Sequence, residues 1–159
     1  MVRPNGLAFS ADETKLYVAD TGRTHGAQNP AHIRVFNVNK AGKVSGGKVF
    51  ADCTAGLFDG FRLDVEGRIW TSTKEGVHCY DPDGTLIGKV FVPEPVANCC
   101  FGGAKMNVLY ITGTTSLYRV RVMTNNPLKI AALEHAGLEV VADQRIMGRM
   151  NDHNVRYLA

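Results

Sequence analysis

Residues 60–71 read GFRLDVEGRIWT, and this stretch decides the fold class. Two short runs of mixed apolar and polar residues lie on either side of the turn Glu66-Gly67. Alternation of this kind is typical of half-buried strands, and a Gly-containing turn between two such runs predicts an antiparallel hairpin. The stretch therefore indicates a β protein built from short strands and tight turns.

The same layout occurs three times along the chain. Residues 6–19 (GLAFSADETKLYVA) and 100–112 (CFGGAKMNVLYIT) repeat the hairpin, and each hairpin is followed by a further strand-like run. Aromatic residues recur in the second and third runs: Tyr17, Trp70 and Tyr110, then Phe36, Tyr80 and Tyr118. A period of about forty residues is typical of β-propeller blades. A β-sandwich with irregular hairpins is the alternative, but it does not predict the same aromatic in the same strand three times.

The pattern changes after Val122. Residues 119–123 and 138–142 read as strands, and residues 127–136 read as a helix that begins at Pro127 and ends before Gly137. We therefore expect a mainly β, partial propeller of about three blades over residues 1–120. A small α/β fragment should follow over residues 121–159.

Composition excludes several classes of protein. The chain is 45% hydrophobic and 21% charged, and its net charge of +3 is not gathered into a Lys/Arg block, so we expect no nucleic-acid partner. No apolar run approaches the roughly 18 residues of a membrane span, and the N-terminus has no signal-peptide pattern, so a cytoplasmic location without a membrane partner is expected. The four cysteines lack CxxC spacing, which favours free thiols over a zinc site or disulfides.

Two short phrases carry oxygen ligands. Asn5 in RPNGL and Asp59 in FDGF each precede a Gly and then a strand-like run. Amide and carboxylate oxygens suit a hard divalent cation, and a carboxylate near a metal can take a proton from water. Asp59 in an Asp-Gly turn, and Asn5 in Pro-Asn-Gly, could equally serve local hydrogen bonding.

Residues 1 to about 120 resemble the gluconolactonase/regucalcin (senescence marker protein) family of six-bladed β-propeller lactonases. The matching phrases are RPNGLAFSADETKLYVADTG, HIRVFNV, DGFRLDVEGRIW and GVHCYDPDGTLIGKV. The resemblance covers the C-terminal half of the family's usual length. It implies a divalent metal (calcium, zinc, magnesium or manganese) on the propeller axis, with Asn5 and Asp59 as two ligands and Asp59 also as the catalytic base. The family's third ligand, a Glu, has no counterpart here.

Residues 119–159 resemble a different family, the C-terminal end of GTP cyclohydrolase II of the riboflavin pathway. The matching phrases are VRVMTNNPLKIAALEHAGLEVV and GRMNDHNVRYLA. The resemblance implies that Thr124 and Lys129 are substrate-binding residues if this tail is functional. The chain thus looks like a join between two unrelated incomplete proteins.

The expected function is metal-dependent hydrolysis of a sugar lactone to the aldonic acid, impaired by truncation. The alternatives are a non-catalytic propeller fragment and a fusion remnant with a cyclohydrolase-like tail. The expected partner is a small sugar lactone. Self-association through open propeller edges is also expected, because an open half-propeller exposes edge strands.

Overall fold

A computed structural model describes residues 1–104 and 106–120. The chain divides into two units, Met1–Arg121 and Val122–Ala159, and the described residues belong to the first. The predicted helix at 127–136, the strand at 138–142, Thr124 and Lys129 lie outside the described residues. Within the described part, no helix is long and apolar enough to cross a membrane.

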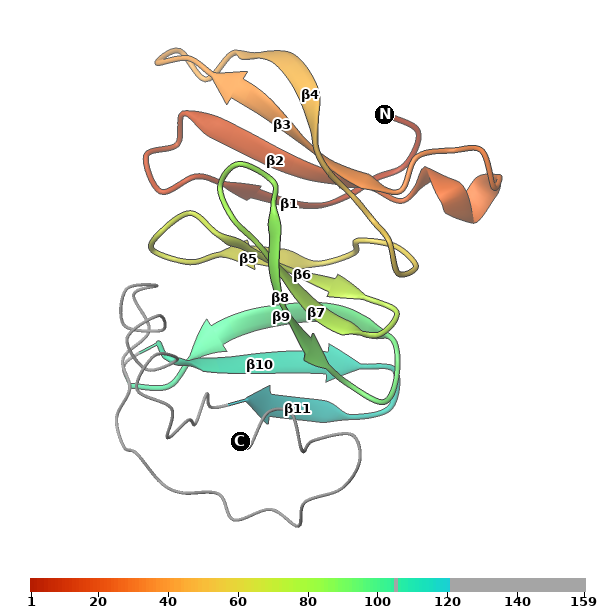
Figure 1. Ribbon diagram of the computed structural model, residues 1–159. Helices are drawn as coiled ribbons and strands as arrows, with labels where there is room; N and C mark the ends of the chain where they lie inside the picture. The colour runs from red at the N-terminus through yellow and green to blue at the C-terminus, as the bar shows by residue number, and fades with distance from the viewer. Residues whose placement is uncertain (105, 121–159) are drawn as a thin grey trace. The chain divides into compact units, whose positions relative to one another are not determined.

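Three antiparallel sheets follow one another in chain order (Figure 1). Blade 1 contains β1 (Pro4–Phe9), β2 (Lys15–Asp20), β3 (His32–Val38) and β4 (Val44–Asp52). Blade 2 contains β5 (Phe61–Leu63), β6 (Ile69–Thr73), β7 (Gly76–Tyr80) and β8 (Leu86–Phe91). Blade 3 contains β9 (Val96–Gly102), β10 (Val108–Gly113) and β11 (Leu117–Val120), and a 3-10 turn, η1 (Gly22–His25), follows β2. The strands of each sheet pair in sequence order, which confirms the predicted partial propeller of about three blades.

Side-chain hydrogen bonds fix the hairpin that opens blade 2. The Asp64 Oδ1 atom accepts the backbone N–H groups of Glu66 and Arg68, both at 3.0 Å. Asp64 Oδ2 accepts Arg68 Nε at 2.7 Å and the indole N–H of Trp70 at 2.9 Å. Gly67 completes the turn with a φ of 77°, a conformation that glycine adopts without strain. The turn therefore aligns β5 with β6 and orients the Trp70 ring.

The register of the three sheets places the aromatic residues of the second strands at equivalent positions. It does not do so for all three aromatic residues of the third strands. Tyr17, Trp70 and Tyr110 occupy the same place in β2, β6 and β10, as predicted. In the third strand, Phe36 pairs with Leu16 and Tyr80 pairs with the equivalent Ile69. The corresponding pair in blade 3 is Leu109 with Val120, whereas Tyr118 pairs with Ile111. Tyr118 therefore lies two pairs further along the same two strands, because a strand repeat is set by pairing and not by residue type.

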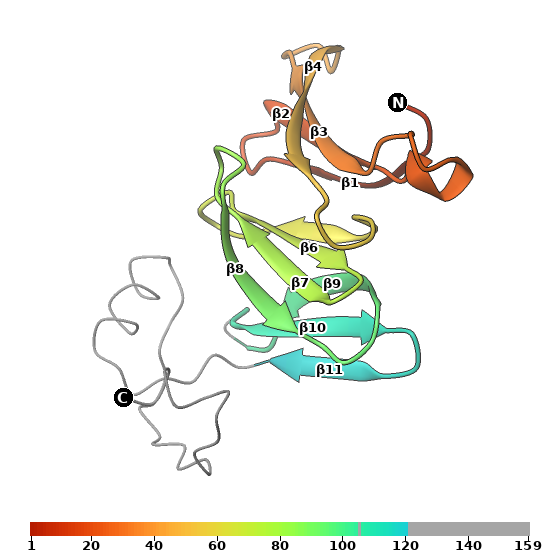
Figure 2. The same ribbon diagram turned by 45° about the vertical axis from the view of Figure 1, so that its right-hand side comes forward.

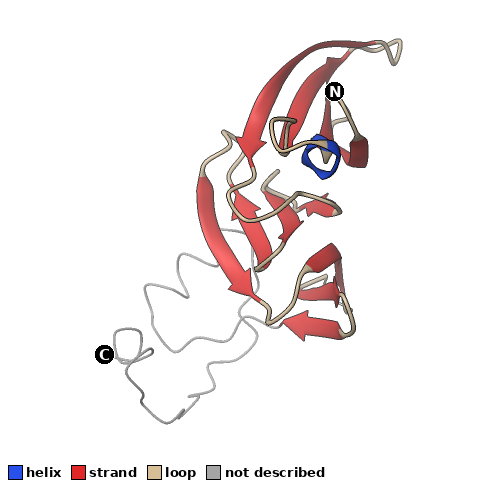
Figure 3. Ribbon diagram, turned by 90° about the vertical axis from the view of Figure 1, so that its right-hand side faces the viewer, coloured by secondary structure: helices blue, strands red, loops and turns tan. Residues whose placement is uncertain are grey.

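Two apolar cores hold together the three consecutive sheets, whose arrangement Figure 2 shows. The first lies between blades 1 and 2, where the Phe58 and Tyr80 rings meet edge to face at 5.6 Å. The second lies between blades 2 and 3, where Trp70 meets Phe101 edge to face at 5.7 Å. Blade 2 is thus covered on both faces. Figure 3 shows the middle sheet between the other two.

The first strands of the three sheets, β1, β5 and β9, lie next to one another. A Cβ added to Gly6 would meet the backbone carbonyl of Asp59, so glycine is required for β1 to approach β5 this closely. The N–H of Gly60 donates to the carbonyl of Ala97 at 2.8 Å and ties β5 to β9. These inner strands bring residues from three sequence repeats to one place.

Candidate functional site

Equivalent positions at the start of the inner strands carry the candidate site. Asn5 precedes Gly6 on β1, Asp59 precedes Gly60 at β5, and Ala97 precedes Asn98 on β9. The pairing of β1 shifts register between Pro4 and Leu7, and that of β10 with β9 shifts between Thr112 and Gly113. Such irregularities bend a strand and re-aim side chains, as bulges commonly do beside functional sites. Two of the three positions thus present an oxygen-bearing side chain, and the third presents a methyl group.

The structure brings Asn5 and Asp59 together, although 54 residues separate them in sequence. Asn5 Nδ2 donates to Asp59 Oδ1 at 2.7 Å. The Asp59 backbone N–H donates to Ser72 Oγ at 3.0 Å, and the Ser72 N–H donates to the Gly60 carbonyl at 3.0 Å. Asn5 is exposed and Asp59 is half-buried, so the pair is held by its neighbours and still open to solvent.

Both side chains line a cavity of about 360 Å³. Its wall comes from the loops that follow β2, β4, β6 and β8, which places it at one end of the three sheets. The other lining residues are Thr21, Thr24, Gly56, Leu57, Thr73, Lys74, Pro95 and Val96. The cavity lining therefore combines threonine hydroxyl groups, one lysine ammonium group and one carboxylate with apolar side chains.

The donor set of this cavity fits part of a divalent metal site. Among the described residues, no Lys, Arg or His forms an ion pair with Asp59, so its carboxylate is available. A half-turn of the Asn5 amide exchanges its nitrogen and oxygen, which lets its oxygen face a cation beside Asp59. No group of three His, Cys, Asp or Glu residues gathers around a point within the described part of the chain. Two oxygen ligands are therefore present, fewer than the six to eight that calcium takes.

Asp20, which the sequence did not single out, positions the start of β1. It is fully buried, and its carboxylate accepts the N–H groups of Val2 at 2.7 Å, Arg3 at 2.8 Å and Gly22 at 3.0 Å. Burial acts to raise the pKa of Asp20, but these backbone hydrogen bonds outweigh it and leave the pKa below its ordinary value. Asp20 thus stays ionised and holds the segment that carries Asn5. An Asp directly after an apolar strand run was the available sequence signal.

A second polar group lies between blades 1 and 2. His78 is fully buried, and its Nε2 atom lies 2.8 Å from Glu75 Oε1, which also accepts Lys89 Nζ at 2.7 Å. Within residues 1–104 and 106–120, His78 Nδ1 and the hydroxyl of Thr71, its partner across the β6–β7 pair, have no hydrogen-bond partner. Burial lowers the pKa of His78. None of these four residues lines the Asn5/Asp59 cavity.

Comparisons of sequence and of structure with known proteins give the same family of relatives for the described part of the chain. The family model described as "SMP-30/Gluconolactonase/LRE-like region" matches residues 1–115. A gluconolactonase of Zymomonas mobilis is 34% identical over 132 residues, covering 77% of this chain and 35% of the relative. A solved gluconolactonase structure from Xanthomonas campestris has 37% identity and a TM-score of 0.68, covering 75% of this chain and 38% of that one.

A third similar structure is a regucalcin from Agrobacterium tumefaciens, described as a calcium-binding protein. It is 26% identical, with a TM-score of 0.61, and the match covers 82% of this chain and 42% of that one. The chain therefore spans between 35% and 42% of the length of these relatives. Separately, a stretch of 40 residues is 45% identical to GTP cyclohydrolase-2 of Azotobacter vinelandii, covering 25% of this chain and 19% of that protein. Both resemblances drawn from the sequence are thereby confirmed.

Proposed function

The chain belongs to the SMP-30/gluconolactonase/LRE-like family, and we propose from this premise that its Asn5/Asp59 pocket takes part in metal-dependent hydrolysis of a sugar lactone to the aldonic acid. The observation that carries the proposal is the 2.7 Å contact between Asn5 and Asp59 inside a cavity of about 360 Å³. The similarity to gluconolactonases supports a small sugar lactone as the substrate.

A divalent cation (calcium, zinc, magnesium or manganese) held by Asp59 and the amide oxygen of Asn5 would polarise the lactone carbonyl. The similarity to a regucalcin described as a calcium-binding protein supports the use of a divalent metal. Asp59 accepts a proton from water as the water oxygen bonds to the carbonyl carbon. The bond from that carbon to the ring oxygen then breaks, and the ring oxygen takes up a proton to become a hydroxyl group.

The threonines of the cavity suit a polyhydroxylated substrate. The Thr21 hydroxyl donates to the Arg3 carbonyl at 3.2 Å, and the Thr73 hydroxyl donates to the Gly76 carbonyl at 3.0 Å. Their protons are thereby engaged. Thr73 Oγ1 also accepts the Glu75 N–H at 3.3 Å, so one lone pair of Thr73 and those of Thr21 remain to accept hydrogen bonds from sugar hydroxyls. These threonines would orient the lactone ring with its carbonyl towards Asp59.

An activity assay on matched variants tests this proposal. The acid released during gluconolactone hydrolysis is measured in a pH-stat, from the base needed to hold the pH constant, for wild type, Asp59→Asn and Asp83→Asn. Asp83 also precedes a Gly but does not line the cavity, so it controls for loss of an Asp-Gly carboxylate. Loss of the base should lower kcat/KM by about 100-fold or more in Asp59→Asn, while Asp83→Asn stays near wild type. Equal activity of the two variants would refute the assigned mechanism.

A second candidate is a propeller fragment that binds a cation weakly and does not catalyse. The presence of only two oxygen ligands among the described residues favours it. Cation binding without measurable lactone hydrolysis would select this candidate.

The assignment of Thr124 and Lys129 to a GTP substrate rests on the tail's resemblance and the 40-residue match alone. We expect a GTP-dependent rise in melting temperature if that role is retained. An unchanged melting temperature would remove it.

A further inference from the structure

Two sheet faces have no partner among the described residues. The open face of blade 1 is apolar: Leu7 and Phe9 on β1 are 59% and 47% exposed, and Leu16 and Phe36 continue this face on β2 and β3. The open face of blade 3 contains Cys100, Tyr110, Thr112, Leu117 and Arg119, of which Leu117 is 71% exposed. Large exposed apolar side chains that share one sheet face are typical of an interaction surface.

The strand register shows which face of blade 2 corresponds to the open face of blade 1. Its row Phe9–Leu16–Phe36 corresponds to Leu63–Ile69–Tyr80 in blade 2. In blade 2 that row packs against blade 1, and Ile69 is fully buried there. The open face of blade 1 is therefore the kind of face that receives a preceding blade.

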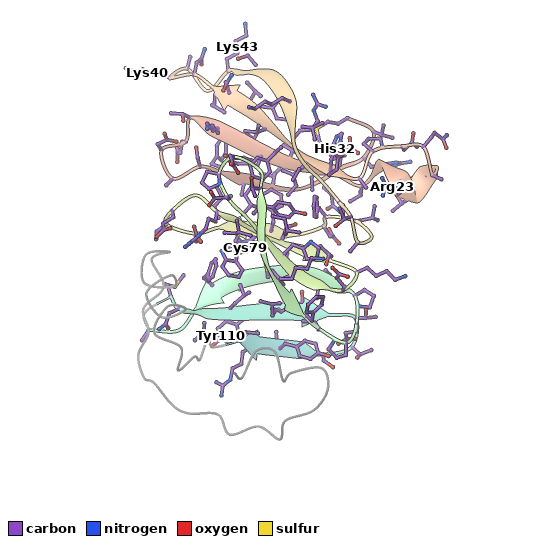
Figure 4. All side chains as sticks on the ribbon, viewed as in Figure 1. Arg23, His32, Lys40, Lys43, Cys79 and Tyr110 are labelled. Carbon is purple, nitrogen blue, oxygen red and sulfur yellow. The ribbon has the colours of Figure 1, made fainter. Side chains whose placement is uncertain are left out.

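The open face of blade 3 corresponds to the opposite face of a blade, the one that packs on the next blade. Its row Cys100–Tyr110–Arg119 corresponds to Arg62–Trp70–Cys79 in blade 2, the face that packs on blade 3. Figure 4 marks Tyr110 on the last sheet and Cys79 on the middle one. Thr112 and Leu117 likewise correspond to Ser72 and Val77, and Val77 is fully buried at the junction of blades 2 and 3. The open face of blade 3 is therefore the kind that lies on a following blade.

We propose that two copies of this chain associate, with blade 3 of each copy packed on blade 1 of the other. A contact between two different surfaces closes into a ring when its rotation closes. The chain spans 35% to 42% of the length of the relatives it matches, so a second copy supplies a comparable share of blades. Two copies would then complete one propeller about a twofold axis. The contacts repeat the blade-to-blade packing already present twice within the chain, which is why a second copy is the fitting occupant.

This arrangement would also complete the cation site, a consequence that rests on the proposed function. Asn5 lies on the inner strand β1, and Asp59 lies two residues before the neighbouring inner strand β5. A twofold axis through the ring places these two residues opposite the partner's Asn5 and the partner's Asp59. Two carboxylates and two amide oxygens then surround one position, a ligand set that suits a hard divalent cation.

The pairing is tested by measuring mass in solution by light scattering for the whole chain and three variants. Phe9→Asp disrupts the open face of blade 1 and Leu117→Asp that of blade 3, while Val65→Asp adds a charge at an 87% exposed position in a hairpin turn. Wild type and Val65→Asp should show twice the 17.3 kDa of one chain, and the two face variants should be monomers with unchanged circular dichroism.

A mixture of the two face variants provides a second arm. The Phe9→Asp chain retains an intact blade 3 and the Leu117→Asp chain an intact blade 1, so the mixture should recover a dimer through one undamaged junction. A wild-type monomer at every concentration, a dimer unaffected by Leu117→Asp, or a mass that grows without limit would each overturn the closed pairing.

Calcium titration by calorimetry tests the shared site. We expect one Ca²⁺ per two chains for wild type, at least tenfold weaker binding for the monomeric Phe9→Asp variant, and loss of binding for Asp59→Asn. Unchanged affinity with one Ca²⁺ per chain in Phe9→Asp would overturn the shared site. A dimer that binds Ca²⁺ but does not hydrolyse lactones would leave this inference standing and refute the proposed function.

Discussion

At the scale of single residues, His78 links stability to pH. Its neighbours are Glu75 and Lys89 through Glu75 Oε1, with Thr71 and Tyr80 beside it in the sheet. Burial lowers the pKa of His78 below its ordinary 6.5 in the folded chain, so the unfolded chain binds the proton first as pH falls. The contribution of a neutral His78 is therefore present above about pH 6.5 and is lost progressively below it.

We predict that the free energy of unfolding falls as the pH drops below about 6.5, by at most about 1.4 kcal/mol per pH unit. The His78→Gln variant should lose most of this slope, and His25→Gln, a change at an exposed histidine on η1, should keep it. Urea unfolding at several pH values measures the slope. The same slope in wild type and His78→Gln would show that another group controls it.

Gly6 sets the distance between blades 1 and 2 at the candidate site. An added Cβ would collide with the Asp59 backbone carbonyl, which has no free rotation to yield. We predict that Gly6→Ala lowers the free energy of unfolding by about 1–3 kcal/mol, as overpacking does. Gly88→Ala is the matched control, since its Cβ would meet only Cys79 Cβ at 4.0 Å. Equal stability of the two variants in urea would contradict the close approach of β1 and β5.

At the scale of elements, the hairpin between β5 and β6 depends on Asp64. Its carboxylate accepts two backbone and two side-chain hydrogen bonds, including those from Arg68 and Trp70. We predict that Asp64→Ala destabilises the fold by about 3 kcal/mol, because two backbone N–H groups and the Trp70 indole N–H lose a charged acceptor, while Arg68 keeps Glu66 at 3.1 Å. Thermal unfolding measures this, with Asp83→Ala, in an exposed turn, expected to cost less than about 1 kcal/mol. Similar losses in both variants would refute the special role of Asp64.

The elements show what sequence reasoning can and cannot supply. Hairpins such as 60–71 were predictable, because alternation and turn residues are local signals. Tyr118 lies in the third strand of its repeat, as predicted, but two pairs away from the position of Phe36 and Tyr80, because spacing between aromatics does not report cross-strand register. Asn5 and Asp59 were singled out by their oxygen-bearing side chains beside a Gly, and the family resemblance supplied their expected roles. Their 2.7 Å contact, and the support that Asp20 gives to β1, depend on the packing of distant repeats and needed the structure.

At the scale of the whole molecule, the alkylation rate of Cys100 reports whether the open face of blade 3 is covered. Cys53, Cys79 and Cys99 are buried, and burial raises the pKa of Cys79 and of Cys99 to about 12, which disfavours the reactive thiolate. Cys100 is exposed on the open face of blade 3. We predict that alkylation of Cys100, located by peptide mapping, is at least tenfold slower in wild type than in monomeric Phe9→Asp. Equal rates would show that this face stays uncovered.

The central claim is that Asp59 and Asn5 act with a divalent cation in lactone hydrolysis. The most direct measurement is the pH-stat rate of gluconolactone hydrolysis before chelation, after removal of divalent ions and after their return. We predict that chelation lowers the wild-type rate to that of Asp59→Asn, that added cation restores it, and that the rate of Asp59→Asn responds to neither step. A wild-type rate that survives chelation, or an Asp59→Asn rate that equals it, would contradict the account.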